Sequence, residues 1–233
     1  MKWKRRSIAA GVVAASLMLI APAAFASNLV AVNGTSSPAA DVPVTGSLSG
    51  TISFITDFGV PASCTTASVG GHIKRGASAT VGTKIGAITN LTFGNTGGTG
   101  CSSTGLGYPF LIKKSTKTGS PVEWPIHLTS TPAKGSGSAA IEIRNVAMKM
   151  HSTGLTRWGM DLEATGTVPA KIFQGATPQI QITPTAGVFP LALQAFDGWG
   201  TNTAAEHTMF GQIYTGDGMQ MTATFNLSTP ITW

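Results

Sequence analysis

The sequence predicts an all-β protein: an antiparallel β-sandwich or barrel-like domain with one disulfide, preceded by an N-terminal signal peptide. Three observations lead to this prediction. Apolar and polar residues alternate with a period of two in many short segments, as they do in strands with one buried face. Clusters rich in turn-forming residues separate these segments, and the chain contains 29 Gly and 13 Pro. No stretch of a dozen residues shows the 3.6-residue period of an amphipathic helix.

The first 26 residues have the composition of a secretory signal peptide. Residues 2–6 supply four basic side chains, an apolar run follows from Ile8 to Ile20, and Ala24-Phe25-Ala26 forms a small-x-small cleavage site. We therefore expect the mature chain to begin at Ser27 and to be secreted, either extracellular or associated with the cell wall. No second apolar run approaches the ~18–20 residues of a membrane helix, so we expect no transmembrane helix after cleavage.

The mature chain divides by composition into two parts. Residues 27–45 are small and polar with two prolines, which predicts a flexible lead, and residues 46–233 form a single β domain. Without the signal peptide, eleven Lys and Arg balance nine Asp and Glu, so we expect no nucleic-acid partner. Lys113, Lys114 and Lys117 form the densest basic cluster, which is typical of a solvated strand end.

The clearest strand is residues 219–227, in which apolar and polar side chains alternate without interruption. It follows the turn signal Gly216-Asp217-Gly218, so Gln212–Thr215 is its predicted hairpin partner. In residues 141–150 the apolar phase changes by one residue around Asn145, which predicts a β-bulge. Further strands are predicted at residues 85–93, 108–112, 124–128, 160–164 and 179–182.

Cys64 and Cys101 are the only cysteines of the chain. In an exported protein such a pair predicts one disulfide. The alternative is a metal site with two thiolate ligands, but the sequence has no CxxC pair and no histidine at ligand spacing from either cysteine.

Residues that could carry catalysis are isolated. The four histidines, His72, His127, His151 and His207, form no HxH or HExxH motif, although convergence of His127 and His151 in space stays open. Asp161 and Glu163 share one face of a predicted strand, and because their apolar neighbours occupy the other face, we expect this pair to face water. No Gly-x-Ser-x-Gly motif is present. We therefore predict a protein that is not an enzyme, with no catalytic residue, metal or cofactor.

Three tryptophans, Trp124, Trp158 and Trp199, lie beside predicted turns. An exposed indole near the loops of a β domain stacks on sugar rings, so these residues are candidates for contact with a carbohydrate ligand. The competing interpretation is that each tryptophan packs against the end of the core.

The C-terminal alternation continues through Leu227 to the terminal Trp233. An apolar stripe ending in an aromatic residue is typical of the closing strand of outer-membrane barrels, which makes an envelope β-barrel pore an alternative. Only two tyrosines are available for an aromatic girdle, and Pro230 interrupts the strand.

Residues 50–128 contain several short motifs of secreted β proteins. They are Cys64 followed by Ser68-Val69-Gly70-Gly71-His72-Ile73, then Ile85-Gly86-Ala87-Ile88-Thr89, Leu91-Thr92-Phe93-Gly94-Asn95 and Trp124-Pro125. In these motifs the chain resembles a group of secreted Thr/Gly-rich β proteins of actinobacteria. Asn95 stands where that group has a cysteine, and here the cysteine is Cys101. The resemblance implies an extracellular β structure with no established activity.

Together these observations predict a secreted, non-enzymatic protein of the extracellular space or cell envelope, acting as a structural, adhesive or binding module. Its expected partner is a cell-wall glycan or another surface protein. The alternatives are a carbohydrate-binding module that uses the loop tryptophans and the envelope pore.

Overall fold

The computed structural model describes residues 28–57, 59–95, 100–103, 109–115, 122–152, 161–195 and 216–233. All regular secondary structure in these ranges is β-strand, which confirms the all-β prediction. The described residues contain no helix with the length and apolar character needed to cross a bilayer. The strands are β1 (Ala31–Val32), β2 (Ala40–Leu48), β3 (Ile52–Thr56), β4 (Pro61–Cys64), β5 (Thr66–Arg75), β6 (Lys84–Gly94), β7 (Phe110–Lys114), β8 (Trp124–Leu128), β9 (Ser138–Ser152), β10 (Asp161–Phe173), β11 (Gln179–Ile182), β12 (Leu191–Ala195), β13 (Gly218–Leu227) and β14 (Ile231–Thr232).

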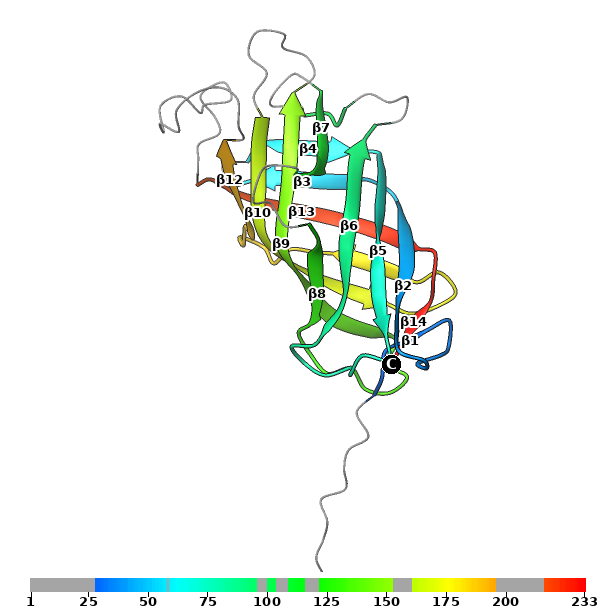
Figure 1. Cartoon of the computed structure of the whole chain (residues 1–233). Helices are drawn as coiled ribbons and strands as arrows, with labels where there is room; N and C mark the ends of the chain where they lie inside the picture. The colour runs from blue at the N-terminus through cyan, green and yellow to red at the C-terminus, as the bar shows by residue number, and fades with distance from the viewer. Residues whose placement is uncertain are drawn as a thin grey trace, which may run out of the picture.

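The strand pairings close into a ring, so the domain is a barrel rather than an open two-sheet sandwich. The ring runs β13–β2–β5–β6–β8–β9–β10–β11 and returns to β13, with every pair antiparallel. At the other end of the barrel, β7 takes the place between β6 and β9, and β12 takes the place between β10 and β13. Figure 1 shows β13 crossing behind β6 and β9 at a steep angle.

Apolar side chains fill the inside of this ring. The alternation in β13 places Met219, Met221, Ala223, Phe225 and Leu227 inside, and each is buried. Phe93 of β6 lies at the centre of an aromatic cluster, edge-on to Phe54 with ring centroids 5.8 Å apart. Its ring also stacks on Phe225 with centroids 6.4 Å apart. Burial of these side chains is the main source of stability for the barrel.

The bulge predicted in β9 is confirmed. Val146 pairs with Gly166 of β10 and Ile143 pairs with Val168, so two residues of β9 lie opposite the single Thr167. Asn145 has φ of 54°, a left-handed conformation that asparagine adopts more easily than most residues. The extra residue moves the apolar side chains back to the inner face, which explains the phase change in the sequence.

Residues 28–45 contain β1 and the first part of β2, which corrects the flexible lead predicted at residues 27–45. β1 pairs with β14, and β2 pairs with β5 from Ala40 to Ser47. Backbone hydrogen bonds to other strands hold this small, polar stretch, and composition does not reveal such bonds. The predicted hairpin partner Gln212–Thr215 lies outside the described residues. Met219 pairs with Leu191 of β12 on one side and with Thr56 of β3 on the other.

The predicted disulfide joins Cys64 to Cys101, with Cα atoms 4.5 Å apart and both residues fully buried. It lies where β6 is interrupted. β6 pairs with β7 through Thr92 and Phe93 and ends at Gly94. Residues 100–103, which we call the seam segment, then continue its line: Cys101 bridges to Phe110 of β7, and Ser102 bridges to Ser63 of β4.

Candidate functional site

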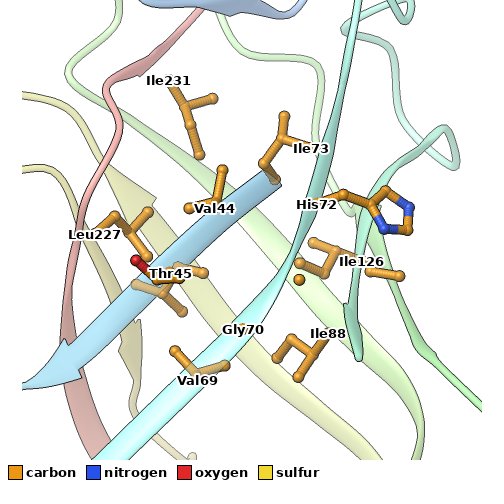
Figure 2. Close-up of a pocket in the computed structure, with 13 residues that line it drawn as sticks. Val44, Thr45, Val69, Gly70, His72, Ile73, Ile88, Ile126, Leu227 and Ile231 are labelled. Carbon is orange, nitrogen blue, oxygen red and sulfur yellow. The ribbon is translucent and has the colours of Figure 1, made fainter. Parts of the chain in front are cut away.

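The cavities lined by the described residues of the barrel are small. Two apolar voids lie within or beside the described core, with volumes of about 30 and 20 Å³, and each has roughly the size of one water molecule. Figure 2 shows Val44, Ile73 and Leu227 around the larger void, with the imidazole of His72 pointing away from it. Side chains therefore occupy the space that a larger barrel offers to ligands.

Trp124 is part of this filling and is not available to an external ligand. It lies on β8, is 2% exposed and lines the smaller void. Its indole Nε1 is buried without a hydrogen-bond partner. Trp124 therefore packs in the core, and the prediction that it stacks on a carbohydrate ligand is wrong. Its alternation with Ile126 and Leu128, which are also buried, already indicates an inward position. Trp158 and Trp199 lie outside the described residues.

The chain stretches that contain Trp158 and Trp199 are attached to neighbouring strands at one end of the barrel. Residues 153–160 join β9 to β10, and residues 196–215 join β12 to β13. Leu162 of β10 pairs with Ala195 of β12, so the strand ends that bound the two stretches lie side by side. Sequence separation alone does not reveal this proximity, because β11 lies between β10 and β12 in the chain.

Glu163 lies on the outer face of the wall, as its alternation with Leu162 and Ala164 predicts, but it is only 3% exposed. The expectation that the Asp161 and Glu163 pair faces water is therefore wrong for Glu163. Its neighbours across the strands are Lys149 of β9 and Gln194 of β12. Gln194 donates a hydrogen bond from Nε2 to Glu163 Oε2 at 2.9 Å, which compensates part of the cost of burying a carboxylate.

The described histidines do not converge. His127 of β8 pairs with Glu142 of β9, whereas His151 lies nine residues further along β9, a separation of roughly 30 Å at the rise of an extended strand. His127 Nδ1 lies 2.9 Å from the carbonyl oxygen of Gly82, which only accepts. No group of three or more His, Cys, Asp or Glu in the described ranges has the geometry to hold a metal ion.

Charged side chains gather on the outer wall formed by β2, β5, β6, β8 and β9. Lys84 forms an ion pair with Glu123, and Arg144 forms one with Glu142. His72 Nε2 lies 4.0 Å from Asp41 Oδ2. The hydrogen bond from Lys84 lowers the pKa of Glu123, against the opposing effect of burial. We call these residues the charged wall: Asp41, His72, Lys84, Glu123, Glu142 and Arg144.

The charged wall brings together residues that are isolated in sequence, and sequence reasoning did not find it. Glu142 and Arg144 lie two residues apart on β9, whereas the other members are distant in sequence and become neighbours through strand register. Lys84 and Arg144 each pair with a carboxylate, so the arrangement fits a solvated barrel wall better than a site that activates a nucleophile.

Comparison with known proteins adds no assignment. No protein-family model matches the chain, and no curated protein or solved structure is significantly similar to it.

Proposed function

We propose that this is an exported, non-enzymatic protein that acts through its outer surface, as a structural, adhesive or binding module outside the cell. The observation that carries the proposal is a barrel with an apolar, filled interior and a disulfide inside its core. Such an interior supports stability rather than ligand storage, and a persistent disulfide is typical of an oxidising compartment. The resemblance to secreted Thr/Gly-rich actinobacterial proteins agrees with this proposal.

Fractionation of the producing cells, followed by intact mass measurement, tests this proposal. We expect the protein in the medium or the wall fraction, starting at Ser27 and lighter than its reduced form by the two hydrogens of one disulfide. A chain that keeps residues 1–26 and stays in the cytoplasm would contradict export. Turnover of a substrate that disappears on substitution of one carboxylate or histidine would contradict the non-enzymatic assignment.

A second candidate function is carbohydrate binding by Trp158 and Trp199. The pairing of Leu162 with Ala195 favours it, because it anchors the two tryptophan-containing stretches next to each other. An indole suits stacking on a sugar ring of a glycan. Because Trp124 and Trp233 are buried, we assign any fluorescence change on adding ligand to the other two tryptophans of the mature chain.

Titration with soluble fragments of cell-wall or plant glycans tests carbohydrate binding. We expect quenching or a spectral shift in the mature protein and loss of the response in Trp158→Ala and Trp199→Ala. Trp124→Phe is the matched control and should keep the response. Retention on insoluble glycan that is unchanged in both alanine variants would remove this function and leave the broader proposal intact.

The envelope pore has less support than either function. The apolar stripe of β13 points into the barrel, whereas Gln220, Thr222, Thr224 and Asn226 point outward. A membrane-spanning pore needs the opposite arrangement, with an apolar outer band and a polar lumen.

A further inference from the structure

The place between β4 and β7 is the weakest part of the described barrel wall. β6 has a long ladder with β5, from the pair Thr66–Gly94 to the pair Ile73–Gly86. Beyond Gly94, the seam segment has one bridged residue pair on each side, Ser102 with Ser63 and Cys101 with Phe110. Ladders this short have little stability of their own.

Hydrogen bonds hold the seam segment on both edges. Ser63 N donates to Ser102 O at 2.8 Å, and Ser102 N donates to Ser63 O at 2.9 Å. On the other side Phe110 N donates to Cys101 O at 2.9 Å. Ser103 Oγ adds a bond to the carbonyl oxygen of Pro61 at 2.6 Å. The disulfide from Cys101 to Cys64 is the covalent link between the seam segment and β4.

Removal of the seam segment would create two unpaired strand edges. Within the described residues, β4 pairs with β3 on one side and meets only the seam segment on the other. Phe110 of β7 would lose its partner on the seam side at the same time, while it keeps Ser152 of β9 on the other side. Open edges of this kind accept another extended strand, whereas a closed barrel has none to offer.

We propose that the Cys64–Cys101 disulfide is a latch that keeps the barrel monomeric, and that its opening turns the seam into a pairing site for a second copy of the chain. The occupant of the opened seam is residues 100–103 of the other copy. This segment already fits both edges in register and in hydrogen bonding, and exchange of an identical element is a low-cost route to a dimer.

The redox step needs a dithiol reductant. The dithiol transfers two electrons and two protons to the S–S bond, so that Cys64 and Cys101 become thiols and the reductant becomes a cyclic disulfide. Because both cysteines are fully buried, removing the disulfide by substitution is a cleaner test than reduction. Alanine suits these apolar positions better than serine, which would bury an unpartnered hydroxyl.

The test compares the mature protein with the Cys64→Ala/Cys101→Ala variant by amide hydrogen exchange and sedimentation. In the monomeric variant at low concentration, we expect the Ser63, Ser102 and Phe110 amides to exchange at least about tenfold faster, while Val69 and Leu91 in the long ladder change much less. At high concentration we expect a dimer in which the three seam amides regain protection.

Ile172→Ala is the matched control, because Ile172 is fully buried on β10 and the substitution leaves the disulfide intact. This variant should be less stable and monomeric. Ser102→Pro is a second test, because it removes the amide that bonds to Ser63 while keeping both cysteines; it should accelerate exchange at Ser63 and Phe110. A cysteine variant that stays monomeric, or whose exchange rises equally in the seam and the long ladder, would overturn the proposal. So would dimerisation of Ile172→Ala to the same extent.

Discussion

β6 and the seam segment follow the same line in the barrel wall but are held there in different ways. β6 pairs with β5 over eight residue pairs and also with β7 and β8. The seam segment has one bridged pair on each side and a disulfide. A long ladder with a buried apolar face needs no covalent support, whereas a short continuation of the same line depends on it.

The largest expected effect on stability comes from a substitution in β6, the strand that the long ladder holds. Phe93 lies on β6 between Phe54 and Phe225 and is 1% exposed. We expect Phe93→Ala to lower the free energy of unfolding by about 3–5 kcal/mol, because it removes aromatic contacts and leaves a cavity. Urea unfolding measures this change, and Phe93→Leu should lose clearly less. Equal losses in the two variants would show that the ring contacts contribute little.

Removal of the disulfide that holds the seam segment should lower the free energy of unfolding by a comparable or slightly smaller amount. The disulfide closes a loop with a sequence separation of 37 residues, and the chain-entropy model assigns about 3–4 kcal/mol to such a loop. We expect Cys64→Ala/Cys101→Ala to lose that amount in urea unfolding. A loss below about 1 kcal/mol would mean that hydrogen bonds and packing hold the seam segment without the disulfide.

The bulge in β9 is also an interruption of a ladder, but the ladder continues on both sides of it. β9 resumes pairing with β10 directly after one extra residue, and no covalent link is needed there. Asn145→Val should cost roughly 1–2 kcal/mol, because a β-branched residue strains the left-handed conformation. Asn145→Gly should be close to neutral and serves as the control. If valine is tolerated as well as glycine, the bulge is not set by the conformation of this residue.

The smallest expected effect on the free energy of unfolding comes from an ion pair on the outer wall. Glu123 is paired with Lys84, and its side chain is 37% exposed, so Glu123→Gln should cost under about 1 kcal/mol. Because folding lowers the pKa of Glu123 below 4.5, the pair stabilises the protein above that pH and is lost as the pH falls through the folded pKa. Unfolding curves of the two proteins should therefore converge as the pH falls through the folded pKa of Glu123. A difference that persists in acid would point to packing rather than charge.

The alternation of side chains determined much of this fold from sequence alone. It predicted the strands at residues 219–227 and 124–128 and the bulge at Asn145, because strand period and phase are local properties. The cysteine count predicted the disulfide for a similar reason, since an exported chain with only two cysteines offers one pairing.

Closure of the barrel, burial of Glu163 and inclusion of residues 40–45 in the wall were decided only by the tertiary structure. Alternation tells which residues share a face, but it does not tell what covers that face or which distant strand pairs with an edge. Long-range strand pairing made neighbours of β10 and β12, and it gave the seam segment its place between β4 and β7. The proposed glycan-binding end and the proposed latch both depend on those pairings, so neither follows from the sequence without the fold.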